Sequence, residues 1–528
     1  MHMQNPEPNP CVVENVADCS AVREGIIALP QPSASVNFVV GNIHATISLI
    51  LLNRNLSMPS KRVRIAEAVV NELSHMGKFY SHADRKDFAT AMYFNQGSKS
   101  LERIQSDGFQ SWLASWLNIN RADVLFTFIL RAIEDAALSG PETNAILPER
   151  FWAARQDAIY LSNGVGEIIR VKAGEVQLVD NGTDEVLFDC GKTLQPWSLV
   201  EPVDPFVTCA LLRDVSVSDP LDHLALKLWA LALPSQQRSK PPLALVGDIG
   251  SGKTRIANGL AQLFGVPPHE AKADEKKEGD FWAAVDQGGL FTLDNADSRI
   301  SWLADAVASA STGGVSVKRK LFTDGETITL HSNSHIILTC ANPAFAEDPG
   351  LADRLIVVRL NRRTGQTSDK ALSDQIADNR DAGLSFIAHT LSRALADRSP
   401  IPPGLNLRHP DYAALAVRIG RGLGCENDAI KSLRRSESQK AVFCLENDAI
   451  GAALRNLIDE NKSFNGTAAD LLAKLIAADP DLGNQSITTR GLSRRLRQLW
   501  PHLESVFRAS SKTAHGGAIQ FSINQRES

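Results

Sequence analysis

A glycine-rich segment that ends in a lysine and a threonine is the part of the sequence best suited to do chemistry. It reads Gly247-Asp-Ile-Gly-Ser-Gly-Lys-Thr254 and lies between an apolar run, 243–246, and a helix-compatible run, 255–264. Glycines let a loop bend so that successive backbone N–H groups face one phosphate, and the N-terminus of the next helix adds positive charge. The spacing predicts a P-loop that binds ATP, with Lys253 at the β- and γ-phosphates and Thr254 at Mg²⁺. A ligand-free glycine turn is the alternative, but both flanks and the Lys-Thr pair fit the P-loop. The residues expected to bind the nucleotide are Gly247, Asp248, Gly250, Ser251, Gly252, Lys253, Thr254 and Arg255.

Two later apolar runs end in polar side chains that could complete an ATPase site. The run 289–294 ends in Asp294, which is followed by Asn295. We expect Asp294 to bind Mg²⁺ beside Thr254, although many buried strands end in Asp. The run 335–341 leads to Asn342, whose amide could orient the attacking water or sense the γ-phosphate. An ordinary Asn-Pro turn is the alternative there.

Arg354 follows Leu351-Ala-Asp353 and directly precedes another apolar run. A guanidinium in this place could reach the γ-phosphate of a neighbouring subunit and neutralise charge in the transition state. The alternative is a surface arginine that pairs with Asp353.

Two basic segments are candidates for contact with nucleic acid. The segment 316–330 has β-like arms around an Asp-Gly turn, and its first arm carries Lys318, Arg319 and Lys320. A hairpin is therefore expected, either bound to DNA phosphates or simply a solvated edge hairpin. Near the C-terminus, a pattern of two helices followed by two strands predicts a winged helix. The expected helices are 467–478 and 490–499, and the expected strands are 506–510 and 518–523. The arginines of its second helix are expected to bind duplex DNA: Arg490, Arg494, Arg495 and Arg497. A module that serves protein contact alone is the alternative.

Length and composition limit the class of protein. A chain of 528 residues is expected to hold about three domains, and its net charge of −5 argues against a wholly basic coat for nucleic acid. The seven cysteines form no Cys-x-x-Cys pair, which favours a reduced, cytoplasmic compartment and argues against zinc. No apolar stretch is long enough to span a bilayer, so no membrane contact is expected.

The order of these motifs resembles that of superfamily 3 helicases of the AAA+ class. The resemblance covers about 211–363 and rests on the P-loop, Asp294-Asn295, Thr312-Gly-Gly314, the basic hairpin, Asn342 and Leu351-Ala-Asp-Arg354. The chain looks most like the primase-helicase-like replication ATPases of phages, plasmids and mobile genetic islands. This resemblance implies a homo-oligomeric ring, a hexamer, that binds ATP and Mg²⁺ between subunits. It implies Asn342 as a sensor, Arg354 as a finger acting on the next subunit, and a hairpin that holds single-stranded DNA in the channel.

The expected fold is α/β, an AAA+ P-loop ATPase core with an α+β N-terminal region and a C-terminal winged helix. The expected parts are a flexible N-terminus (1–35), an α+β module (36–145), a small β-rich module (146–205), the ATPase core (206–365), a helical region (366–460) and the winged helix (461–528). The expected function is ATP-driven movement along single-stranded DNA during replication of a mobile element or phage.

One position departs from the pattern of the family. Asn295 stands where many AAA+ ATPases have a glutamate that polarises water, and an amide cannot act as a general base. Asp297 or another carboxylate could substitute. Slow hydrolysis leaves open an ATP-binding replication initiator or scaffold, and a defence-associated ATPase is a further alternative that the basic hairpin argues against.

Overall fold

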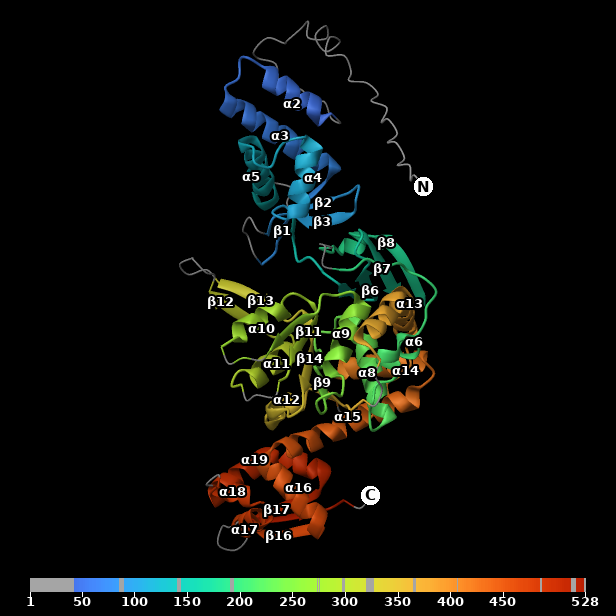
Figure 1. Cartoon of the computed structure of the whole chain (residues 1–528), viewed down its shortest axis with the longest axis vertical. Coiled ribbons are helices and arrows are strands. Elements are labelled where there is room, and N and C mark those ends of the chain that lie inside the picture. Colours follow the sequence, from blue (N-terminus) through green and yellow to red (C-terminus); the bar gives the residue numbers. More distant parts are fainter. Residues whose placement is uncertain are drawn as a thin grey trace, which may run out of the picture.

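The computed structural model gives a mixed α/β protein with several sheets. It describes residues 42–84, 90–139, 144–189, 194–272, 274, 276–296, 300–319, 327–363, 367–405, 407–484, 487–513 and 519–526. The N-terminal stretch 1–35, which we expected to be flexible, lies outside these residues. Figure 1 shows an N-terminal module at one end, a central body around a parallel sheet, and a C-terminal module at the other end.

The N-terminal module packs helices against a small sheet. Its elements are α2 (Ile43–Leu52), α3 (Met58–Met76), β1 (Gly77–His82), β2 (Met92–Asn95), β3 (Ser100–Arg103), α4 (Asp107–Leu117), α5 (Val124–Ser139) and β4 (Asn144–Ile146). The strand order is β3-β2-β1-β4, and β2 and β3 form an antiparallel hairpin. Phe126 is buried, and Trp112 and Trp116 stack at 5.5 Å against the same core. These aromatic rings therefore contribute to the packing of the module.

The β-rich segment forms an antiparallel meander that is joined to the central body. Its strands are β5 (Trp152–Arg155), β6 (Ala158–Ser162), β7 (Glu167–Lys172) and β8 (Glu175–Asp180). An isolated bridge between Glu149 and Phe188 follows the last strand of the meander. Phe151 and Trp152 belong to the same hydrophobic cluster as Leu243 of the central sheet. The meander and the central body therefore share one core.

The central body is built on five parallel strands. In spatial order they are β10 (His269–Lys272), β11 (Gly289–Asp294), β14 (Ser334–Cys340), β9 (Leu243–Val246) and β15 (Ile356–Arg359). Their near-continuous apolar runs are typical of strands covered on both faces. Along β9, Leu243 and Leu245 enter one hydrophobic cluster and Ala244 and Val246 enter another.

Helices cover both faces of this sheet, as Figure 1 shows. The first cluster contains α8 (Pro220–Ala232), α9 (Lys253–Phe264) and α13 (Asp369–Ala396). The second contains α10 (Glu278–Val285) and α11 (Leu303–Ser311). The carboxyl ends of the strands are left open between these layers, and ligands of open α/β sheets bind at that edge.

The C-terminal module begins earlier than the sequence indicated. After α14 (Pro410–Gly422), the long helix α15 (Glu426–Asn447) leads into α16 (Ala449–Asn461). We expected α16 in the helical region, but its apolar face packs with the C-terminal elements. Those elements are β16 (Ser463–Thr467), α17 (Ala468–Ala478), α18 (Pro480–Asn484), α19 (Thr489–Val506), β17 (Arg508–Thr513) and β18 (Ile519–Asn524), with the strand order β16-β18-β17. Within the described residues, no helix has both the length and the apolar character needed to cross a bilayer.

Candidate nucleotide-binding and DNA-binding sites

The glycine-rich segment forms a tight loop between β9 and α9. Gly250 and Gly252 have positive φ values of 86° and 89°, a region that glycine adopts without strain. A Cβ on Gly247 would lie 2.4 Å from the carbonyl oxygen of Leu360, so the chain passes too close for any other residue. The loop therefore requires glycine at these three positions for steric reasons alone.

Lys253 is the first residue of α9 and is buried. Its Nζ donates hydrogen bonds to the carbonyl oxygens of Gly247 (2.5 Å) and Asp248 (3.1 Å). The ammonium group is thus held over the loop, where it would face a phosphate bound by the loop N–H groups.

Thr254 and Asp294 meet at the carboxyl edge of the sheet. The hydroxyl of Thr254 donates to Asp294 Oδ1 at 2.8 Å, although the two residues are 40 positions apart. Thr339, near the end of β14, donates to the same oxygen at 2.6 Å, and the amide of Asn295 donates to Asp294 Oδ2 at 3.0 Å. Three neighbours therefore fix the carboxylate of Asp294.

Thr339 was not predicted from the sequence. Its side chain is fully buried in an apolar strand, and its hydroxyl also accepts the backbone N–H of Asn295 at 3.1 Å. Only the register of β14 beside β11 brings it to Asp294. A threonine within an otherwise apolar run was the one signal in the sequence.

The donor set suits a hard divalent cation. Thr254 and Asp294 offer one hydroxyl and one carboxylate, the oxygen ligands that Mg²⁺ prefers. No group of three or more His, Cys, Asp or Glu side chains that could hold a metal occurs in the described part of the chain. An ion at this site would therefore need phosphate oxygens and water to complete its shell, as Mg²⁺ does beside a nucleotide.

A cavity opens above the loop. It is lined by Ile249, Gly250, Gly252, Lys253, Thr254, Arg255, Asn295 and Arg363. Arg255 forms an ion pair of 2.5 Å with Asp369, the first residue of α13. Asp248 is exposed and its carbonyl oxygen accepts a hydrogen bond from Lys253, whereas Ser251 is buried. Of the predicted loop residues, Gly250, Gly252, Lys253, Thr254 and Arg255 line the cavity, whereas Gly247, Asp248 and Ser251 do not.

Asn342 lies two residues beyond the end of β14 and is exposed. Since β14 is the neighbour of both β9 and β11, Asn342 lies at the same sheet edge as the P-loop and Asp294. Asp297, the carboxylate that we considered as a substitute base, lies outside the described residues.

Arg354 lies at the amino ends of the parallel strands, opposite the carboxyl ends where the glycine-rich loop lies. β15 starts beside the first residue of β9, with Ile356 opposite Leu243, and Arg354 precedes that point. The P-loop begins where β9 ends, about 10 Å further along the strand at 3.3 Å per residue. Arg354 therefore lies away from the glycine-rich loop of its own chain.

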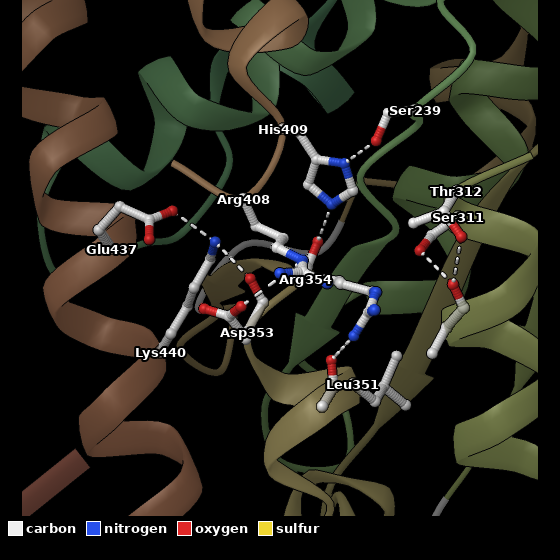
Figure 2. A network of polar contacts seen from close by, with 12 residues as sticks. Ser239, Ser311, Thr312, Leu351, Asp353, Arg354, Arg408, His409, Glu437 and Lys440 are labelled. Carbon is white, nitrogen blue, oxygen red and sulfur yellow. Dashed lines mark hydrogen bonds and ion pairs between the residues drawn. The ribbon is translucent and has the colours of Figure 1, made fainter. Parts of the chain in front are cut away.

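The peptide groups around Arg354 are held from two sides (Figure 2). Lys440 of α15 is buried and donates to the carbonyl oxygen of Asp353 at 2.8 Å, and it also pairs with Glu437. His409 contacts the carbonyl oxygen of Arg354 at 3.1 Å and the hydroxyl of Ser239. The backbone of the arginine is therefore fixed.

Burial, followed by the charge of Lys440, lowers the pKa of His409 to about 4. The imidazole is then neutral near pH 7 and carries one N–H. A carbonyl oxygen can only accept, so Nε2–H donates to Arg354 and Nδ1 accepts from Ser239. The guanidinium of Arg354 donates to Gly350, and burial followed by the charge of Arg408 lowers its pKa. An anion bound at Arg354 would offset the repulsion between the positive charges of Arg354 and Arg408.

The predicted basic hairpin is present as β12 (Val315–Arg319) paired with β13 (Thr327–His331). Side chains alternate between its two faces. Val315, Val317 and Arg319 are exposed, whereas Lys318 turns toward α10 and donates to the carbonyl oxygen of Gly279. Lys318 thus differs from the expectation of an outward DNA contact, because strand alternation directs it inward. Lys320 and the turn lie outside the described residues.

The arginines of α19 divide into two groups. Arg490, Arg494 and Arg497 are exposed at i, i+4 and i+7, so they share one side of the helix, which we call the outward arginine face. The leucines of α19 are buried on the other side. The strand β17 adds exposed Arg508 and Lys512. This arrangement presents a row of cations to solvent.

Arg495 has a different environment from the outward arginine face. Its Nε donates to Asp448 at 2.7 Å, and Asp448 is the N-cap residue of α16. The sequence grouped Arg495 with the DNA-binding arginines. The structure instead gives it a nearly buried acidic partner, which joins α19 to the junction of α15 and α16.

Comparison with known proteins gives a family match for the central part of the chain. Residues 215–439 match the family model AICE_RepA, described as actinomycete integrative conjugative element replication protein. The match covers less than half of the chain and includes the P-loop, Asp294, the hairpin and Arg354. The central part is therefore similar to replication proteins of mobile genetic elements. No curated protein matches the chain.

Solved structures of low similarity come from NrS-1. "The apo structure of NrS-1 C terminal region (305-718)" has a TM-score of 0.40 and 11% identity, and it covers 86% of this chain and 97% of that chain. "The A form apo structure of NrS-1 C terminal region-CTR" has a TM-score of 0.38 and 10% identity, with 86% and 98% covered. Similarity at this level does not establish a shared function.

Proposed function

We propose that this chain is an ATP-dependent DNA helicase that serves the replication of a mobile genetic element, with an AAA+ core of the superfamily 3 type. The observation that carries the proposal is the hydrogen bond of Thr254 to Asp294 at 2.8 Å, beside a P-loop whose lysine lies over the loop. The match of 215–439 to a replication protein family supports the same assignment.

In the proposed site, the loop N–H groups and Lys253 bind the phosphates of ATP. Thr254 and Asp294 would hold Mg²⁺, which when bound neutralises charge on the β- and γ-phosphates. Thr339 and Asn295 keep the carboxylate of Asp294 in place.

The position of Arg354 supports a site that two subunits share. It lies at the sheet edge away from its own P-loop, on a backbone held by Lys440 and His409. In a ring of identical subunits, each arginine would reach the ATP of its neighbour. A hexamer is the assembly that we propose, because the resemblance to superfamily 3 helicases implies it.

DNA would be bound in two places. The hairpin of β12 and β13 would contact single-stranded DNA in the channel through Arg319 and the residues of its turn. The C-terminal elements, which we assign to a winged helix, would bind duplex DNA through the outward arginine face. Contacts of both kinds neutralise phosphates and carry no sequence information by themselves.

An ATP-binding initiator or scaffold with slow hydrolysis is the second candidate function. The observation in its favour is Asn295, whose amide donates to Asp294 in place of an acidic side chain that could activate water. Measuring ATP turnover with and without single-stranded DNA separates the two candidates. A helicase should show turnover that DNA stimulates, whereas a scaffold should bind ATP with little turnover.

Displacement of a strand from forked DNA with ATP and Mg²⁺ tests the helicase directly. The full chain should unwind the fork, and the Lys253→Ala variant, which is the control, should not. Lack of unwinding by a full chain that assembles and hydrolyses ATP would contradict the proposal.

A further inference from the structure

Arg363 lies beside the P-loop of its own chain. β15 runs parallel to β9, with Arg359 opposite Val246, so both strands end at the same edge of the sheet. Beyond β15 the chain stays beside the loop: the backbone N–H of Leu360 donates to Val246 at 2.7 Å, and that of Arg363 donates to Gly250 at 3.4 Å. The backbone therefore holds Arg363 against the glycines that would surround a phosphate.

The side chain of Arg363 forms part of the wall of the nucleotide cavity. Its Cδ and Cγ lie 3.2 and 4.0 Å from the position that a Cβ on Gly252 would occupy. Its aliphatic part thus packs on the last glycine of the loop, directly before Lys253. The neighbouring Arg362 is exposed and does not line the cavity, although its Nε lies 3.8 Å from the position that a Cβ on Gly250 would occupy.

The charges around Arg363 leave its guanidinium available. Within the described residues, that group forms no hydrogen bond or ion pair. The carboxylate of Asp214 interacts electrostatically with Arg363, but both of its oxygens already accept hydrogen bonds from Arg213, at 2.8 and 2.7 Å. Arg255, the other arginine of the cavity, already has Asp369 as its partner. A half-buried cation beside Lys253 therefore has no anion of its own among the described residues, in a cavity whose loop is shaped for phosphates.

We propose that Arg363 is a phosphate ligand for the nucleotide bound by its own subunit. This inference rests on the proposed ATP-binding function and deepens it. A guanidinium offers a planar pair of N–H donors that matches two phosphate oxygens, and it remains charged at every relevant pH. The role differs from that of Arg354, which lies at the opposite edge of the sheet. One subunit would thus supply arginines to two nucleotides, one its own and one its neighbour's.

Equilibrium binding of a fluorescent ATP analogue to the full chain with Mg²⁺ tests the proposal. The variants are Arg363→Gln, Arg363→Lys and the matched control Arg362→Gln, which removes the same charge one residue away. Arg363→Gln should weaken binding about 10- to 100-fold, as expected for loss of a hydrogen bond to a charged group. Arg363→Lys should lose less, because it keeps the charge without the paired donors. Arg362→Gln should bind within about twofold of the wild type.

Competition by inorganic tripolyphosphate identifies the part of the nucleotide that Arg363 contacts. Arg363→Gln should weaken tripolyphosphate binding about as much as ATP binding, because the contact is to phosphate. Unchanged thermal unfolding of the variants confirms that they are folded. Wild-type affinity in Arg363→Gln, or weaker binding of ATP with unchanged binding of tripolyphosphate, would overturn this inference alone. Absence of binding by the wild type and Lys253→Ala alike would overturn the ATP-binding function itself.

Discussion

Replacing Thr339 with Val tests how the candidate site is held together. Val keeps nearly the shape of this fully buried side chain and removes its hydroxyl. The hydroxyl donates to Asp294 Oδ1 at 2.6 Å and accepts the backbone N–H of Asn295 at 3.1 Å. The variant therefore removes two hydrogen bonds, one to the acid and one from its neighbour, while it leaves the apolar packing of β14 in place.

The expected magnitude follows from the charge of the acceptor. A hydrogen bond to a carboxylate contributes about 1.5–3 kcal/mol to stability. Thr254 and Asn295 still hold Asp294 in the variant, so the decrease in unfolding free energy should fall near the lower end of that range. Removal of a group that orients a metal ligand usually weakens metal affinity about 10- to 100-fold. The variant should thus need at least about ten times more Mg²⁺ for tight binding of ATP.

Two measurements check this expectation. Urea unfolding without nucleotide reports the effect on stability, and ATP binding over a range of Mg²⁺ concentrations reports the effect on metal affinity. Thr339→Ser is the matched control, because it keeps the hydroxyl and should retain most of the Mg²⁺ affinity. If Thr339→Val unfolds and responds to Mg²⁺ like the wild type, Thr339 does not position Asp294 and the reasoning is refuted.

Four further outcomes are expected. Lys253→Ala should lose most of its ATP affinity in a binding titration, because its ammonium faces the phosphates; near-normal affinity would contradict the P-loop assignment. Arg354→Ala should bind ATP yet hydrolyse it poorly, and mixing it with Lys253→Ala should restore part of the turnover; no recovery in rings shown to co-assemble would count against action across subunits. Changing the outward arginine face to Gln should weaken duplex binding and make its salt dependence shallower in an anisotropy titration. The slope of log affinity against log salt concentration should change by about 0.9 for each phosphate that is no longer neutralised. Arg495→Gln should mainly lower the melting temperature, and equal effects of the two changes on DNA affinity would argue against this division. The pKa of His409 is about 4 in the folded state and about 6.5 in the unfolded state, so the unfolded state binds more protons and acid destabilises the fold. The free energy of unfolding measured with urea should therefore fall by about 2 kcal/mol from pH 7 to pH 5, and His409→Gln should lack this fall. An identical pH dependence in the variant would contradict this expectation.

The sequence by itself determined the chemistry that is local in the chain. The tight loop could be predicted because its glycines, Lys253 and Thr254 lie close together in one short segment, and the loop geometry follows from backbone sterics. Asp294 could be predicted because buried parallel strands read as apolar runs, and a polar residue at the end of such a run lies at the sheet edge. The basic hairpin and the helices at 467–478 and 490–499 were predicted from turn residues and periodicity, which are also local.

Only the tertiary structure decided which distant side chains meet. Thr339 reaches Asp294 because β14 lies next to β11 in one particular register. Lys318 turns inward because strand alternation sets the face of the hairpin that α10 covers. Arg495 and Arg363 look like any other arginine in the sequence. Their surroundings differ because Arg495 pairs with Asp448 at a helix junction, whereas Arg363 follows a strand that ends beside the glycine-rich loop. Contacts between distant segments depend on strand order, register and helix rotation, and no local pattern of residues records these.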